Sequence, residues 1–266
     1  MGRVHPTAIV EDGAKISDDA VVGPFCILGS TVELADGVEL MSHVVISGHT
    51  SIGPGTRVFP HACIGLAPQD LKYRGEKTTL VIGANNIIRE HATLHPGTAS
   101  GKGETRVGDN CLFMVNTHVA HDCRIGSNVI MANNAVMGGH ASIDDFAIIG
   151  GNSAIQQFVR IGKHCMIGGM CGCDSDVIPY GSVAGLRDGL AGLNLIGLRR
   201  RGFTRDEIHT LRRAYRLMFA AEGTLTERVN DVAEMFSTSR LVMEVIEFIR
   251  ADASRPIMQP TYGKSA

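Results

Sequence analysis

The side chains of this sequence best suited to acid–base chemistry are His118, His121 and His140, together with Asp122, which directly follows His121. An imidazole has an unperturbed pKa of about 6.5, so its neutral, proton-accepting form is available near pH 7. Gly139 immediately precedes His140. A histidine beside a bare glycine N–H would supply a general base and a donor for a developing oxyanion. Alternatively, each histidine is simply a solvent-exposed turn residue.

Two polar segments and a cluster of arginines could also bind a substrate. Gln69, Asp70 and Lys72 lie within the segment PQDLKYRGEKTTL, and a second polar segment, TASGKGETR, covers 98–106. Arginines gather near the C-terminal part, at positions 199, 200, 201, 205, 212, 213 and 216. Such a basic face is typical either of a solvated helix or of a site for phosphate or an acidic protein.

A six-residue repeat must position these groups. Aliphatic residues recur at every sixth position from Val4 to Ile64, at Ile82, Ile88 and Leu94, and, with Phe113 as the one aromatic, from Val107 to Ile167. The residue four places later is usually small or β-branched, and glycine often follows the aliphatic. This pattern predicts a parallel β-helix in which three short strands form each coil of 18 residues. The inward aliphatics are each expected to contribute about 1.5–3 kcal/mol by burial.

Coil stacking predicts which outward residues meet. Residues eighteen apart lie one above another, so His121, Gly139 and Gln157 should form one column and Asp122 and His140 the next. Both columns avoid the aliphatic positions and are expected outside the core. Because neighbours on a strand point to opposite faces, the sequence leaves open whether Asp122 contacts His121.

The breaks in the repeat define the domains. We expect a β-helix over 1–186 with external loops near 68–80 and 98–106, a helical domain over 187–255, and a disordered tail over 256–266. Helical spacing indicates a first helix within 189–201 and further helices that begin after Thr204, Thr224 and Ser239.

Composition restricts the class of protein. The 266 residues have a net charge of −2, which disfavours nucleic acid as a partner, and no apolar run is long enough to span a membrane. The N-terminus carries no recognisable secretory signal, so we expect a cytoplasmic protein. The seven cysteines include five at small inward positions (26, 111, 123, 165 and 171), where they should act as small hydrophobes.

Several segments together resemble the UDP-N-acetylglucosamine O-acyltransferase family, which performs the first step of lipid A synthesis. They are QDLKY (69–73), HVAHDC (118–123), AVMGGH (135–140), IIGG (148–151) and GLRRRGF (197–203). The resemblance implies a left-handed coil and a homotrimer with sites between subunits. It also implies transfer of an (R)-3-hydroxyacyl group from acyl carrier protein to the sugar 3-hydroxyl, without cofactor or metal.

The resemblance further implies residue roles. His121 matches the general base and Gly139 the oxyanion donor. Positions around the sugar and the acyl hydroxyl are Asp70, Lys72, His118 and His140. Nucleotide- and phosphate-side positions are Gln69, Gln157, Asn194, Arg200 and Arg201. Gly169 matches a position that limits acyl-chain length, and the arginine face suits acidic acyl carrier protein.

The sequence departs from the family at Gln156, where members such as the enterobacterial enzymes have His, and at Ile196, where many have Glu. A 3-amino sugar as acceptor stays open. Three alternatives remain: a γ-type carbonic anhydrase with a three-histidine zinc site, the related N-acyltransferase that acts later in the same pathway, and a non-catalytic hexapeptide scaffold. The first is disfavoured because its HxxxxH spacing is absent, His91 and His95 being one residue closer.

Overall fold

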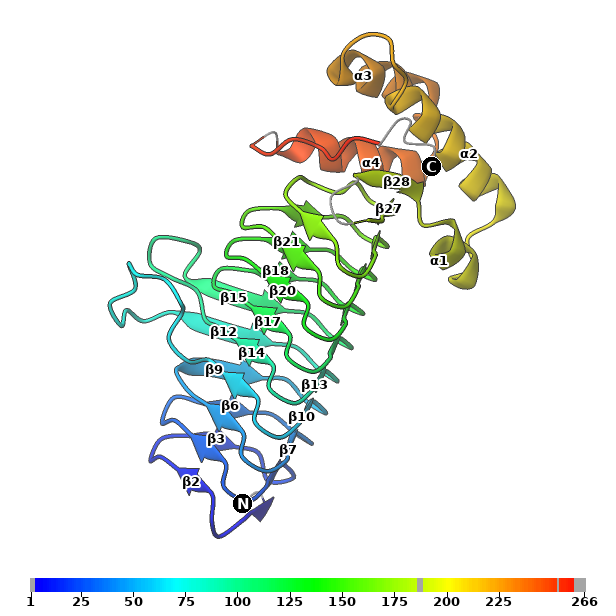
Figure 1. Ribbon diagram of the computed structural model, residues 1–266. Helices are drawn as coiled ribbons and strands as arrows, with labels where there is room; N and C mark the ends of the chain where they lie inside the picture. The colour runs from blue at the N-terminus through cyan, green and yellow to red at the C-terminus, as the bar shows by residue number, and fades with distance from the viewer. Residues whose placement is uncertain (1–2, 186–188, 253, 261–266) are drawn as a thin grey trace.

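The computed structural model describes residues 3–185, 189–252 and 254–260, and its main body is a triangular prism of stacked coils (Figure 1). Each coil contributes one short strand to each of three parallel sheets, which we call sheets A, B and C. Within most strands the first residue faces outward and the second is buried, so two residues suffice to place one aliphatic in the core. The core is therefore the column of aliphatics that the repeat predicts.

The strands of the three sheets are as follows. Sheet A contains β1 (Arg3–Val4), β4 (Val21–Val22), β7 (Glu39–Leu40), β10 (Arg57–Val58), β13 (Ile87–Ile88), β16 (Leu112–Phe113), β19 (Ile130–Met131), β22 (Ile148–Ile149), β25 (Met166–Ile167), β27 (Gly181–Val183) and β28 (Leu190–Leu193). Sheet B contains β2 (Ile9–Val10), β5 (Ile27–Leu28), β8 (Val45–Ile46), β11 (Cys63–Ile64), β14 (Thr93–Leu94), β17 (His118–Val119), β20 (Val136–Met137), β23 (Ala154–Ile155) and β26 (Gly172–Cys173). Sheet C contains β3 (Lys15–Ile16), β6 (Glu33–Leu34), β9 (His49–Ile52), β12 (Thr79–Ile82), β15 (Glu104–Val107), β18 (Arg124–Ile125), β21 (Ser142–Ile143) and β24 (Arg160–Ile161).

The register confirms the eighteen-residue coil. His118 pairs with Val136, and Val136 pairs with Ala154, each one coil further on. Where a loop is inserted, the step lengthens but the stack continues, as in the pairing of Thr93 with His118. The aliphatics of the first coil are less covered, and Val4 is 39% exposed, because within the described residues this coil is stacked on one side only.

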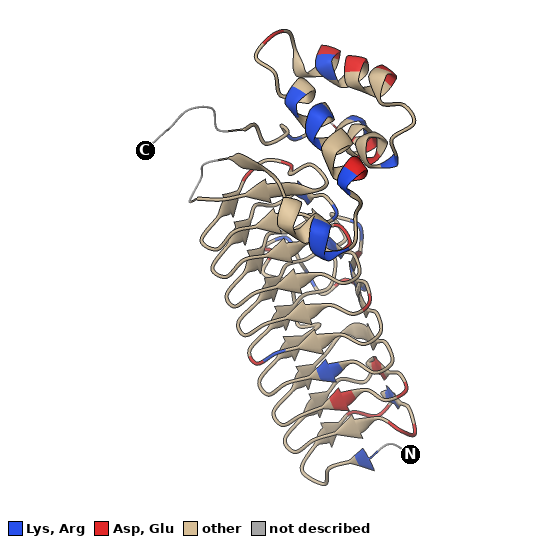
Figure 2. Ribbon diagram, turned by 90° about the vertical axis from the view of Figure 1, so that its right-hand side faces the viewer, with Lys and Arg blue, Asp and Glu red and all other residues tan. Residues whose placement is uncertain are grey.

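The outward faces of the sheets differ in polarity. Sheet C presents charged residues, including Lys15, Glu33, Arg106, Arg124 and Arg160. Sheet A presents aliphatic residues above its first coils: Ile87, Leu112, Ile130, Ile148 and Met166. Figure 2 shows this face of sheet A, where the charged strands are confined to the N-terminal coils.

The described residues form four helices after the prism (Figure 1): α1 (Leu195–Arg200), α2 (Arg205–Met218), α3 (Leu225–Met235) and α4 (Arg240–Ala251). Helix α4 lies across the C-terminal end of the prism, α1 lies beside its last coils, and α2 and α3 project away from it. Capping boxes begin α2 at Thr204 and α3 at Thr224, which confirms both predicted starts. Ser239 precedes α4 but makes no capping bond through its side chain. None of the helices described is long and apolar enough to cross a bilayer.

Two predictions about this end differ from the structure. The helix expected within 189–201 begins only at Leu195, because Leu190–Leu193 forms β28, antiparallel to β27. The prediction of a disordered tail over 256–266 is wrong for 256–260, where the Met258 N–H donates to the Asp176 carbonyl and Ile257 is buried. Positions 261–266, like 186–188, lie outside the described residues. The inserted segments span 65–78 and 95–103, slightly N-terminal to the predicted loops.

Candidate active site

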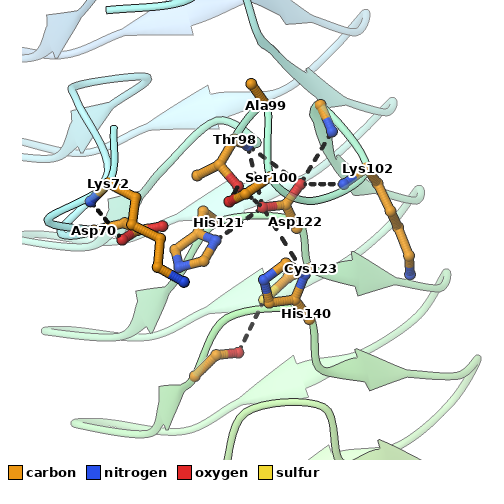
Figure 3. Close-up of polar contacts among 12 residues, drawn as sticks. Asp70, Lys72, Thr98, Ala99, Ser100, Lys102, His121, Asp122, Cys123 and His140 are labelled. Carbon is orange, nitrogen blue, oxygen red and sulfur yellow. Dashed lines mark hydrogen bonds and ion pairs between the residues drawn. The ribbon is translucent and has the colours of Figure 1, made fainter. Parts of the chain in front are cut away.

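His121 and Asp122 lie in the turn between β17 and β18, at the corner that joins sheets B and C. Asp122 has a φ of 59°, so the alternation expected of a strand does not apply, and both side chains point the same way. His121 Nδ1 lies 2.8 Å from Asp122 Oδ2 (Figure 3). The structure thus answers the question that the sequence leaves open: the carboxylate contacts the imidazole.

The segment 95–103 buries Asp122 completely and surrounds its carboxylate with donors. Oδ1 accepts from the N–H groups of Lys102 and Gly103 at 2.7 and 3.1 Å, and Oδ2 accepts from the Thr98 hydroxyl at 2.7 Å. Burial alone would raise the pKa of Asp122, but the hydrogen bonds from Thr98, His121 and Lys102 outweigh it and lower that pKa below its ordinary value.

The ionised carboxylate orients the histidine. A carboxylate only accepts hydrogen bonds, so Nδ1 of His121 must carry the proton. The lone pair of the neutral ring is then on Nε2, and the side chain is 16% exposed. The site therefore contains one oriented proton acceptor, Nε2 of His121, and Asp122 fixes the orientation of the ring through Nδ1.

Gly139 lies directly against the His121 ring, as the eighteen-residue column predicts. A Cβ on Gly139 would be 2.7 Å from both Nε2 and Cε1 of His121, so no larger residue fits without moving the imidazole. Among the described residues, none accepts a hydrogen bond from the Gly139 N–H. A glycine here leaves room for the ring and an unused backbone donor.

His140 and His118 flank this pair. The His140 ring meets the His121 ring edge-on at 5.0 Å and stacks on Phe158 at 4.5 Å. Burial, aided by His121 and Lys102 and opposed by Asp122, lowers the pKa of His140. The pKa of His118 is also lowered by burial, and its Nδ1 lies 2.7 Å from the Thr93 hydroxyl. Both rings therefore favour the neutral form.

Two hollows meet at His121. One, of about 830 Å³, lies toward the loops and contains Asp70, Lys72, Lys102 and His140. The other, of about 520 Å³, lies over sheet B and contains His118 and Gly139. Gln69, His121 and Gln157 line both hollows. The structure thus brings nine predicted site residues together: Gln69, Asp70, Lys72, His118, His121, Asp122, Gly139, His140 and Gln157.

The remaining predicted residues lie elsewhere in the chain. Asn194, Arg200 and Arg201 line a cavity of about 770 Å³ over sheet A. Asn194 caps α1 and also donates to the His164 carbonyl, while Arg201 donates to the Phe146 carbonyl at 2.8 Å. Gly169 lies at the exposed corner between sheets A and B, with room for a Cβ at 3.4 Å from the Gly151 oxygen.

His95 is a site residue whose position the sequence does not reveal. It is 6% exposed, lines the second hollow and lies edge-on to His118 at 5.0 Å. Burial, with His118 and His121 nearby, lowers the pKa of His95 to about 4. The eighteen-residue step could not find it because His95 begins the inserted segment 95–103, which lengthens the step from this coil to the next.

Comparison with known proteins identifies the relatives of this chain. Residues 176–258 match the family model described as "Udp N-acetylglucosamine O-acyltransferase; Domain 2", and residues 104–139 match the bacterial transferase hexapeptide model. An acyl-[acyl-carrier-protein]–UDP-N-acetylglucosamine O-acyltransferase of Methylobacterium radiotolerans is 65% identical over 97% of this chain and 94% of its own. The same-named protein of Caulobacter vibrioides is 54% identical over 97% of this chain and 98% of its own.

Solved structures agree with these matches. The UDP-N-acetylglucosamine acyltransferase of Francisella novicida superposes with a TM-score of 0.93 at 37% identity, covering 97% of this chain and 95% of that one. The corresponding Campylobacter jejuni structure gives a TM-score of 0.90 at 38% identity, covering 97% and 99%. The predicted fold class, a left-handed parallel β-helix with a C-terminal helical domain, is confirmed.

Proposed function

Because this chain belongs to the acyl-[acyl-carrier-protein]–UDP-N-acetylglucosamine O-acyltransferase family, we propose that it acylates the sugar of UDP-N-acetylglucosamine in lipid A biosynthesis. The donor is an (R)-3-hydroxyacyl group on acyl carrier protein, and the acceptor is the 3-hydroxyl of the sugar. Neither a zinc-dependent carbonic anhydrase nor a non-catalytic scaffold is favoured by full-length relatives that are named acyltransferases.

One observation carries the mechanism: a histidine held from behind by a buried carboxylate, with its free nitrogen against a bare glycine. Nε2 of His121 takes the proton of the sugar hydroxyl as that oxygen attacks the thioester carbonyl. The Gly139 N–H donates to the oxyanion that forms. When the C–S bond breaks, the imidazolium returns the proton to the departing thiolate. Asp122 positions the ring and stabilises its charged form.

The residues around His121 suit the substrates. Lys72 and Asp70 come from one loop and His140 and Gln157 from neighbouring coils, so their donors and acceptors surround the 830 Å³ hollow. We assign this polar set to the sugar and the acyl hydroxyl, with Gln69 and His118 alongside. Gly169, at the corner between sheets A and B, has no side chain that would limit the length of the acyl chain.

The polarity of the faces supports the homotrimer. Sheets A and B meet at a corner, and their outward faces carry aliphatic side chains such as Ile148 and Val136, whereas sheet C is charged. A heterologous contact of face A on face B closes into a ring, and three triangular prisms complete it. This packing brings Asn194, Arg200 and Arg201 of one copy opposite the His121 hollow of the next, where they would reach the nucleotide phosphates.

Partner and compartment follow from the same reaction. Arg199, Arg205 and Arg212 line a hollow of about 710 Å³ on the helical domain. A cluster of guanidinium groups suits an acidic acyl carrier protein, which would present its thioester at this end of the prism. We place the enzyme in the cytoplasm, where acyl carrier protein is available.

The test replaces His121 with Ala and measures transfer from 3-hydroxyacyl carrier proteins of graded chain length. UDP-N-acetylglucosamine and its 3-amino analogue serve as the two acceptors. We expect kcat to fall about 10²-fold or more, whereas His5→Ala, an exposed histidine far from the site, keeps normal turnover. Near-normal kcat in His121→Ala would remove this residue from the mechanism.

The shared site is tested separately by mixing subunits. The rates are measured with both substrates well below their KM values for Arg200→Ala, so that neither parent is appreciably active. His121→Ala and Arg200→Ala chains, unfolded and refolded together in equal amounts, should then regain activity in about one quarter of the sites, those whose two contributing copies are both intact at the relevant residue. If both residues acted within one copy, the mixture would be no more active than its parents.

A further inference from the structure

We propose that His121, Asp122 and His140 bind a divalent transition-metal ion such as Zn²⁺, and that this ion inhibits acyl transfer. The inference concerns the catalytic site and so rests on the proposed function for its consequence, although the binding itself does not. The ion would be an inhibitor and not a cofactor, because it occupies the atoms that orient the base.

The distances fit such an ion. His121 Nδ1 lies 2.8 Å from Asp122 Oδ2, and His140 Nδ1 lies 4.0 Å from the same oxygen. The three ligand atoms all lie within 4.8 Å of one another. Ligands at the usual 2.0–2.1 Å from a tetrahedral Zn²⁺ are about 3.3 Å apart, a value between the two observed separations. Small rotations of two imidazoles would therefore complete three ligand positions.

The surroundings supply the rest of the site. The hollow beside His140 is open, so a water molecule can take the fourth position. Asp122 is held by Thr98 and by the N–H groups of Lys102 and Gly103, which are the outer contacts that keep a ligating carboxylate in place. Oδ2 accepts from the Thr98 N–H at 3.1 Å and from the Thr98 hydroxyl at 2.7 Å, and the ion would take the place of its third donor, the Nδ1 proton of His121.

The ligand types predict which metals bind. Two imidazole nitrogens and one carboxylate suit Zn²⁺, Ni²⁺ or Cu²⁺, whereas Mg²⁺ and Ca²⁺ prefer oxygen ligands. The charges nearby partly cancel: Asp70 lies in the same hollow as Lys72 and Lys102.

Inhibition follows from the tautomer of His121. In the free site the Nδ1 proton is donated to Asp122 and Nε2 is the acceptor. When the metal binds Nδ1 in place of that proton, the neutral ring must carry its proton on Nε2. The same nitrogen can then no longer accept the proton of a hydroxyl. No proton is gained or lost by the ring, yet the base is abolished.

The experiment is a Zn²⁺ titration of metal-free enzyme, followed by both initial rate and calorimetry. We expect one ion per chain at the site, at least tenfold loss of rate at saturation, recovery with EDTA, and no effect of Mg²⁺ at the same concentration. His140→Ala should weaken Zn²⁺ binding and raise its inhibition constant about tenfold or more. His61→Ala, which removes an exposed histidine from another corner, should change neither.

The outcomes separate the two hypotheses. If metal-free enzyme shows no acyl transfer, the proposed function fails, while calorimetry still reports on the ion. If Zn²⁺ does not bind, or if it binds and inhibits equally in His140→Ala, the metal site is overturned. Should His140→Ala fold poorly, the visible spectrum of Co²⁺ added to the unmutated enzyme decides: a tetrahedral Co²⁺ spectrum supports the site, and hexa-aquo Co²⁺ refutes it.

Discussion

Gly139→Ala is the most direct test of the stacked geometry. The new Cβ would be 2.7 Å from Nε2 and Cε1 of His121 and 3.2 Å from Nδ1. Non-bonded carbon contacts are ordinarily about 3.5–4.0 Å, so the ring must move by about 1 Å. The Nδ1–Asp122 bond of 2.8 Å opposes that movement from behind. The methyl group therefore acts on the base without removing any functional atom.

A displacement of about 1 Å at a reacting group lowers turnover by about 10²-fold. Steady-state kinetics with saturating acyl carrier protein and UDP-N-acetylglucosamine should show this loss in kcat. The matched control is Gly29→Ala, whose Cβ would make an ordinary contact of 3.4 Å with Ser47 Cα. The double variant Gly139→Ala/His121→Ala should be no slower than His121→Ala alone, because both changes act on one group. Normal kcat in folded Gly139→Ala would refute the reasoning.

Three further outcomes are expected. Asp122→Asn places an amide NH₂ against the N–H of Lys102 or against the Thr98 hydroxyl, both of which donate to the native carboxylate. The free energy of unfolding measured in urea should therefore fall by about 2–3 kcal/mol, and kcat should fall about 10²-fold or more. The pKa of His95 is about 4 in the folded protein, compared with an ordinary value of 6.5 in the unfolded chain. The unfolded chain therefore binds the proton more readily, and the free energy of unfolding falls as the pH drops from 6.5 to 4. At pH 5 the loss is about 2 kcal/mol by urea unfolding, and it should be missing from the pH dependence of His95→Leu. Arg200→Ala should raise the KM for the nucleotide sugar or for acyl carrier protein; unchanged saturation curves for both would exclude Arg200 from binding.

The repeat in the sequence determined the prism and most of its outer wall. The phase of the six-residue repeat fixes which residues of each eighteen-residue coil point inward. The buried aliphatics, the inward cysteines and the stacking of His121 over Gly139 could therefore be predicted without coordinates. The helix starts at Thr204 and Thr224 could also be predicted from the sequence, because a capping box involves only four consecutive residues.

Tertiary structure decided what local patterns do not encode. Asp122 contacts His121 because a left-handed turn residue breaks strand alternation, and it is buried because a loop inserted one coil earlier folds over it. Because of the same insertion, the sequence pattern does not predict the contact between the rings of His95 and His118. Residues 190–193 pair as a strand and 256–260 pack on Asp176 because partners distant in the chain complete their hydrogen bonds. Periodicity specifies stacking between coils, whereas loops and turns acquire their contacts only when the prism has formed around them.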